Sequence, residues 1–149
     1  MESKFQTILN SLDKDFIIWL NQQVVNEDPS STFGLVNPDN IDGAIYSAIY
    51  DFEENHNISR SLAVLIHHIA SGHPFADGNK RTSYALLLTI ISRLSDKNIL
   101  DLRQIIWNSG LREIILTTLA EISSDEDEEK SINTLQEVIE KVIDLSCRH

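Results

Sequence analysis

Apolar side chains recur at intervals of three and four residues along most of the chain, and polar side chains fill the positions between them. This spacing places the apolar residues on one face of an α-helix. The runs cover residues 12–24, 41–52, 58–69, 81–94, 102–106, 111–119 and 132–143. The run that includes residues 84–91 is apolar almost all round, which indicates a central buried helix. The pattern predicts a compact all-α bundle of six or seven helices.

One long interruption separates the first two of these runs. Residues 26–40, NEDPSSTFGLVNPDN, contain two prolines, a glycine and clustered polar side chains, which are typical of a loop. Within it, TFGLV at residues 32–36 combines β-branched and aromatic side chains. We therefore expect a short extended flap or hairpin before the second core helix, which starts near Asp39.

The chain has 149 residues, a length that predicts a single domain over residues 1–149. The acidic side chains of the run SSDEDEEKS, residues 123–131, repel one another, which predicts a solvated acidic loop. A C-terminal helix is expected over residues 131–146. Docking of the acidic loop to a basic partner is the alternative interpretation.

The composition narrows the classes of function. A formal net charge of −11 disfavours binding to nucleic acid through the overall field. The most apolar run, Tyr84–Ile91, is too short to cross a bilayer. Cys147 is the only cysteine, so no internal disulfide can form, which is compatible with a reducing compartment. We expect a cytoplasmic protein that binds neither nucleic acid nor membrane.

The charge is unevenly distributed. Residues 57–95 contain four lysine or arginine residues and a single acid, Asp77, which gives this part of the chain a local charge of +3. Nearby carboxylates would repel an anionic ligand, so their scarcity is what an anion site requires. Lys80 and Arg81 lie side by side in the stretch GHPFADGNKRTS, residues 72–83.

This stretch has the parts of a phosphate site. Gly72 ends one predicted helix and the next begins near Lys80, so unpaired amides and the helix dipole meet at that point. Gly78 and Asn79 can form a nest of backbone N–H groups. Arg81 matches two phosphate oxygens with its planar guanidinium group, and Lys80 adds a mobile charge.

The same stretch has candidates for a metal ligand and a base. Asp77 offers the single carboxylate with which proteins often hold Mg²⁺ beside nucleotide phosphates. His73 offers an imidazole, the side chain that most often accepts a proton from a hydroxyl group in catalysis. Pro74 fixes the backbone after His73, and Phe75 is expected to anchor the loop in the core. Each feature alone would also suit an ordinary turn in which Asn79 caps a helix.

Together, HPFADGNKR at residues 73–81 matches the signature of the Fic/Doc family, His-x-Phe-x-(Asp/Glu)-(Gly/Ala)-Asn-(Gly/Lys)-Arg. The resemblance extends over about residues 35–95. It implies an all-α Fic fold and the transfer of part of ATP, with Mg²⁺, to a hydroxyl side chain of a target protein. The segment TFGLV falls where the family has a flap that positions its target by strand addition.

The roles of individual residues follow from the resemblance. His73 would be the general base and Asp77 would hold Mg²⁺. Gly78 and Asn79 would line the anion hole, and Arg81 would bind the phosphates. Phe75 would be structural.

Two departures from the pattern indicate a branch of the family. The Fic branch, which transfers AMP, usually has Gly at the position of Lys80 and a second Arg at the position of Tyr84. The chain resembles instead the Doc (death-on-curing) branch, whose toxin members phosphorylate a translation factor, elongation factor Tu. The family's inhibitory motif, Ser/Thr-x-x-x-Glu-(Gly/Asn), is not found, which implies a separate antitoxin partner. AMP transfer and a non-catalytic binding module of the same fold are the alternatives.

Two further histidines, His67 and His68, are adjacent in a predicted helix. Neighbouring helical residues face different directions, so we do not expect both to reach one metal ion. Neither forms a zinc ligand set of usual spacing with His73.

Overall fold

The protein is a helical bundle, described here from a computed structural model that covers residues 1–122 and 127–147. These residues form eight helices. Their bounds are α1 Glu2–Ser11, α2 Lys14–Asn26, α3 Asp39–Asn55, α4 Ile58–Ser71, α5 Asn79–Ser95, α6 Ile99–Ser109, α7 Leu111–Glu121 and α8 Glu128–Ser146. None of these residues forms a regular strand, which confirms the all-α fold class.

The prediction of six or seven helices was too low, because α1 was not expected. This helix buries Phe5, Ile8 and Leu9 at the spacing of one helical face. The Phe5 ring meets Phe52 of α3 edge-on, with 5.0 Å between the ring centroids. The short apolar pattern of α1 was therefore present in the sequence, but only its packing against α3 shows that it forms a helix.

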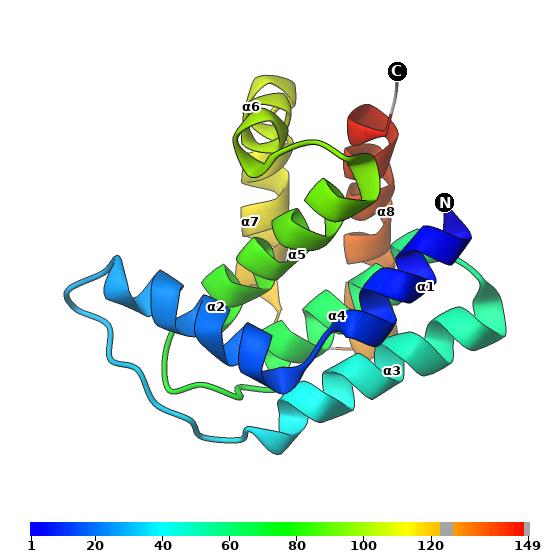
Figure 1. The fold of residues 1–149 in the computed structure, drawn as a ribbon. Helices are drawn as coiled ribbons and strands as arrows, with labels where there is room; N and C mark the ends of the chain where they lie inside the picture. Colours follow the sequence, from blue (N-terminus) through cyan, green and yellow to red (C-terminus); the bar gives the residue numbers. More distant parts are fainter. Residues whose placement is uncertain (123–126, 148–149) are drawn as a thin grey trace.

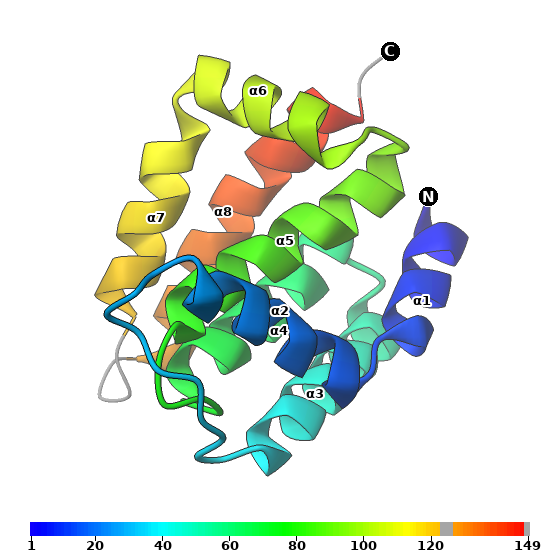
Figure 2. The same ribbon diagram turned by 60° about the vertical axis from the view of Figure 1, so that its left-hand side comes forward.

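The bundle is built around α4, which packs against α3, α5 and α8 (Figure 1). Most of its residues are buried, as expected for a helix covered on several sides. Helix α2 crosses α5, while α6 and α7 follow on from the far end of α5 (Figure 2). The predicted central helix, α5, shares this central place with α4.

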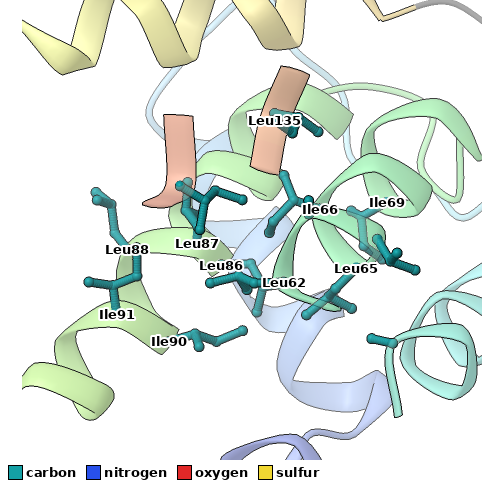
Figure 3. Packing of buried hydrophobic residues seen from close by; sticks show 14 of the residues in the cluster. Leu62, Leu65, Ile66, Ile69, Leu86, Leu87, Leu88, Ile90, Ile91 and Leu135 are labelled. Atoms are coloured by element: carbon teal, nitrogen blue, oxygen red, sulfur yellow. The ribbon is translucent and has the colours of Figure 1, made fainter. Parts of the chain in front are cut away.

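The facing sides of α4 and α5 form the main hydrophobic core (Figure 3). Leu62 and Ile66 of α4 are fully buried against Leu86 and Ile90 of α5, and Leu135 of α8 closes the cluster. Burial of one such side chain contributes about 1.5–3 kcal/mol. This packing fixes the end of α4 and the start of α5, and the loop at residues 72–78 joins them.

The predicted acidic loop is shorter than expected at its C-terminal side. Asp127 caps α8 by accepting hydrogen bonds from the backbone N–H groups of Glu129 and Lys130. Helix α8 therefore starts at Glu128, before the predicted position 131. Residues 123–126 of the predicted loop lie outside the described residues. Every helix of the described ranges is too short or too polar to span a bilayer.

Candidate active site

The loop at residues 72–78 starts where α4 stops, at Gly72. The Gly72 N–H donates to the carbonyl oxygen of His68 at 2.9 Å. A Cβ atom at this position would lie 2.6 Å from the same oxygen, so a side chain cannot be accommodated without a shift of the backbone. Glycine thus allows α4 to end and the chain to turn here.

The loop ends at Gly78, which caps the N-terminus of α5 with a left-handed φ of 74°. Its N–H donates to Oδ1 of Asp77 at 2.9 Å. Asn79 is already the first residue of α5 and has no positive φ, so of the two predicted nest residues only Gly78 adopts the left-handed conformation that a nest needs. The start of α5 brings its positive dipole end to this loop.

Asn79 shapes the loop with its side chain. Its Oδ1 accepts from the Phe75 N–H at 3.0 Å, and its Nδ2 donates to the Phe75 carbonyl oxygen at 2.9 Å. The Phe75 ring is 1% exposed. A buried ring on one side and a two-point amide clamp on the other hold the loop against the core.

His73 lies in this loop with an exposed side chain and a φ of 46°. A left-handed φ is uncommon for a residue other than glycine, and Pro74 restricts the preceding residue further. Such a conformation costs of order 1–3 kcal/mol and persists only where neighbours enforce it. Asn37 contributes by donating from Nδ2 to the His73 carbonyl oxygen at 3.1 Å.

The segment before α3 forms the predicted flap, although it is extended and makes no hairpin. Leu35 and Phe75 form a single antiparallel bridge. On either side of that pair, the Val36 N–H donates to the Pro74 carbonyl oxygen at 2.9 Å, and the Ala76 N–H donates to the Gly34 carbonyl oxygen at 2.8 Å. The flap is therefore joined directly to the loop that carries His73.

Asp77 and Arg81 are one helical turn apart, and Asp77 Oδ1 lies 3.7 Å from Arg81 Nη2. Arg81 Nη2 also donates to Ser31 Oγ at 2.9 Å, and its Nη1 lies 3.6 Å from Asp28 Oδ2. Hydrogen bonds from the hydroxyl and backbone N–H of Ser30 lower the pKa of the Asp28 carboxyl, and the charge of Arg81 adds to this. Arg81 is thus held between two acids, with its side chain still 42% exposed.

Lys80 extends toward a different element. Its Nζ donates to the Ala120 carbonyl oxygen at 3.0 Å, near the C-terminal end of α7. Helix C-termini attract cations through their unpaired carbonyl groups and the dipole. A structural role in joining α5 to α7 is therefore available to Lys80 beside the predicted role in phosphate binding.

Sequence reasoning missed Asn21, which supports the loop from α2. This side chain is fully buried, and its Nδ2 donates to the Asp77 carbonyl oxygen at 2.8 Å and to Thr82 Oγ1 at 3.1 Å. Asn21 lies on the same buried face as Ile17 and Leu20. A polar residue in an apolar stripe was the signal that could have identified it, because a buried amide needs partners.

Asn40 was missed for another reason. Its Nδ2 donates to the Gly72 carbonyl oxygen at 2.6 Å, from an exposed position in the first turn of α3. Nothing in the local sequence distinguishes it from the other polar residues that precede α3. With Asn21 and Asn37, it makes a set of three amide side chains that bind the backbone of the loop from outside.

A groove of about 820 Å³ lies beside the site, between α2, α5, α6 and α7. Aromatic and cationic side chains line it, among them Trp19, Arg81, Tyr84, Arg103, Trp107 and Arg112. Partial burial raises the pKa of the Tyr84 phenol, while Arg112 and Arg103 oppose the shift. The volume falls within the range of small-molecule sites.

The residues around Asp77 fit the requirements of a magnesium ion. Its carboxylate is about half-exposed and lies at the start of α5 near a cation suited to phosphate. Mg²⁺ is usually bound by one or two carboxylates, with water and substrate phosphates in the other positions. The arrangement can therefore bring a triphosphate, a divalent ion and an imidazole onto one loop.

Comparison with known proteins identifies a family. The model of the Fic/DOC family matches residues 11–91, from the end of α1 to within α5. Comparisons with curated proteins and with solved structures gave no match. The family match begins well before the resemblance expected over residues 35–95, and it includes α2, which supplies Asn21 to the loop. Because the match covers more than half of the sequence, the chain belongs to the Fic/DOC family.

Proposed function

We propose that this protein transfers a phosphoryl group from Mg-ATP to a hydroxyl side chain of a target protein. Membership of the Fic/DOC family supports a nucleotide-dependent transferase, since its members typically have that activity. The observation that carries the proposal is the partly exposed Arg81–Asp77 pair at the N-terminus of α5, next to His73 in the loop that precedes this helix. A cation, a metal-binding carboxylate and a base are the groups that such a transfer requires.

In the proposed mechanism, Arg81 exchanges its present partners for phosphate oxygens. Its guanidinium group is held by Asp28 and Ser31 through solvent-exposed contacts, which are weak and replaceable. The N–H groups of the first turn of α5 would bind the same phosphates, and the Gly78 N–H could join them by exchanging its present acceptor, Asp77 Oδ1. Asp77 would hold Mg²⁺, which would help to neutralise the negative charge of the phosphates. His73 would accept the proton of the attacking hydroxyl group, whose oxygen bonds to the γ-phosphorus as the bond to the leaving group, ADP, breaks.

The flap would position the target. In an antiparallel pair such as Leu35 with Phe75, flanked by the two hydrogen bonds, the N–H and C=O of Leu35 point away from the loop. This leaves one edge of the flap available to an extended segment of another protein. Phe33, Leu35 and Val36 are all at least partly exposed on this flap and could hold apolar side chains of that segment.

The groove beside Arg81 would hold the rest of the nucleotide. Trp19 is 51% exposed and Trp107 is 63% exposed at its borders, so a base bound there would contact indole rings. Binding of Mg-ATP should then change the tryptophan fluorescence. Trp19→Phe and Trp107→Phe variants show which ring reports the change, and an unchanged spectrum at saturating nucleotide would exclude this placement.

The direct test uses ATP labelled separately at the α and γ phosphates, incubated with the protein in a cell lysate. Phosphoryl transfer labels a target protein from γ-labelled ATP only and increases its mass by one phosphate group. Labelling from α-labelled ATP, with the mass of AMP, would show instead the AMP transfer of the Fic branch. Labelling from neither, with Mg-ATP bound, would indicate a non-catalytic binding module.

We also propose that the activity serves as the toxin of a toxin–antitoxin pair, with a translation factor as target. The absence of the inhibitory motif from the sequence supports control by a separate protein. Expression of the chain in bacteria should then arrest growth, and the His73→Ala variant should not. Equal growth of both strains at equal expression would contradict the toxin role.

A further inference from the structure

A second cluster of ligating side chains lies where α4 meets α8. His67 and His68 come from the last turns of α4, and Glu128 is the first residue of α8. One ligand atom of each residue lies within 4.8 Å of the other two. The two histidines were expected to face different directions, but their rings meet edge-on with 5.6 Å between the ring centroids, and Glu128 approaches both from another helix.

The hydrogen bonds of His68 orient it as a ligand. Its Nδ1 lies 2.7 Å from the Val64 carbonyl oxygen, which can only accept, so Nδ1 carries the hydrogen. In a neutral ring, Nε2 then presents its lone pair to Glu128 Oε1, an acceptor 3.1 Å away. Two acceptors at this distance need a positive charge between them, which either a proton on the ring or a metal ion supplies.

We propose that His67, His68 and Glu128 bind a divalent transition metal ion of the zinc type. Two imidazoles and one carboxylate form a familiar zinc ligand set, with the fourth position left to water. A metal-bound histidine commonly donates its other N–H to a backbone carbonyl group, as His68 does to Val64. His67 needs only one of its two ring nitrogens for the bond to the metal.

The distances fit one ion after a moderate adjustment. Bonds from zinc to nitrogen or oxygen are about 2.0–2.2 Å, so two ligand atoms of a tetrahedral site lie about 3.3–3.6 Å apart. Separations of up to 4.8 Å therefore have to shorten by about 1 Å, which rotation of a side chain can supply. The Glu128 side chain is 61% exposed and free to make that rotation, while His67 is only 4% exposed and fixed in the packing of α4.

The ion would join the end of α4 to the start of α8, next to the proposed active site. The His68 carbonyl oxygen accepts the hydrogen bond that ends α4 at Gly72, and the loop with His73 follows directly. The site is distinct from the magnesium ligand Asp77, because imidazole nitrogens favour zinc-like ions over magnesium. It goes beyond the proposed transferase activity and does not depend on it.

The test is a metal titration of the full chain without a polyhistidine tag, first stripped of metal with a chelator. Zn²⁺ should bind at one ion per chain and raise the melting temperature. Co²⁺ should produce the strong visible absorption of a four-coordinate site. Glu128→Gln should weaken binding at least about tenfold, since even the loss of an outer-sphere partner costs that much. Glu137→Gln, which removes an exposed acid of the same helix, should bind like the parent.

Three results would overturn the proposal. Absence of binding would show that His68 and Glu128 form an ion pair only, and equal binding by the parent and Glu128→Gln would place the ion elsewhere. Asp77→Asn separates the two sites, because it should lose Mg-ATP binding and keep the zinc titration unchanged. A zinc titration that disappears in Asp77→Asn would assign the metal to the active-site loop and would also contradict the proposal.

Discussion

Two helix junctions of this protein, α4 to α5 and α6 to α7, differ in how much structure supports them. Gly110 alone joins α6 to α7 with a φ of 78°, and a Cβ atom there would meet nothing within 4 Å. Gly78 ends the other junction with a similar φ of 74°, but a Cβ atom there would lie 3.2 Å from Asn21 and 3.3 Å from Val25.

The α4–α5 junction is also bound from several other elements. Side chains of α2, of the flap and of α3 donate to its backbone. Turning the chain between two helices requires only one glycine, as Gly110 shows. The additional contacts of the 72–78 loop therefore serve to hold His73, Asp77 and the start of α5 in one geometry, which is what a catalytic site needs.

The largest effect is expected from replacing His73, one of two histidines that have a positive φ and lie at these turns, by alanine. His73→Ala should lower the rate of transfer by about 10²- to 10⁴-fold, because a positioned base is lost. His56 also has a positive φ, 53°, at the end of α3, and it is exposed. His56→Ala is the matched control and should transfer at the parent rate. A His73→Ala variant with the parent rate would exclude His73 as the base.

A substitution that removes a contact of the α4–α5 junction should lower stability more than one near the α6–α7 junction. Asn21→Ala leaves the Asp77 carbonyl oxygen and Thr82 without their buried partner, which costs about 1–3 kcal/mol. The affinity for Mg-ATP should fall as well, since Asp77 is no longer held. Asn108→Ala on α6, at an exposed surface hydrogen bond, should change stability by no more than about 0.5 kcal/mol. Denaturant unfolding and calorimetry measure both effects, and equal stability of the two variants would refute the role of Asn21.

Gly78→Ala and Gly110→Ala should each lower the stability of the protein, but only Gly78→Ala should also lower the rate of transfer. Each Gly→Ala substitution places a side chain at positive φ, a cost of about 1–2 kcal/mol. Gly78→Ala should also reduce transfer, because the new methyl group pushes against Asn21 beside the phosphate site. Gly110→Ala should leave the transfer rate of the folded protein unchanged. Equal activity of the two variants would show that the tight contact at Gly78 has no catalytic consequence.

The smallest effect is expected for Asp28→Asn, on the affinity for Mg-ATP. Asp28→Asn removes a competitor for Arg81, so Mg-ATP should bind more tightly, by no more than about fivefold. Glu54→Gln, an exposed acid near the other end of α3, should leave the affinity unchanged. Weaker binding by Asp28→Asn would show that Asp28 orients Arg81 rather than competing with phosphate.

The same substitution has an effect on acid stability. The pKa of Asp28 is lower in the folded protein than its ordinary value of 3.8, so folding favours the charged form. That contribution is complete above pH 3.8 and is lost as the pH falls through the lower folded value. The Asp28→Asn variant should therefore lose less stability than the parent in this acidic range.

Sequence periodicity was sufficient to predict the core residues, but it could not predict the contacts within the candidate active site. Spacing alone placed Leu62 and Ile66 inward, because burial of a helix face depends on its own sequence. The loop was also recognised, with Phe75 as its anchor. The ion pair of Arg81 with Asp28 and the hydrogen bond from Lys80 to Ala120 could not be predicted. Both join residues that are brought together only by the packing of separate parts of the chain.

The central claim is that ATP phosphates bind at the N-terminus of α5 through Arg81. Calorimetric titration of the parent and of Arg81→Gln with Mg-ATP tests it directly, with Arg93→Gln on the same helix as control. Charge-assisted hydrogen bonds to phosphate are lost in the first variant, so its affinity should fall at least about tenfold while the control binds like the parent. Equal affinity of Arg81→Gln and the parent, or no binding of Mg-ATP to the parent, would contradict the account.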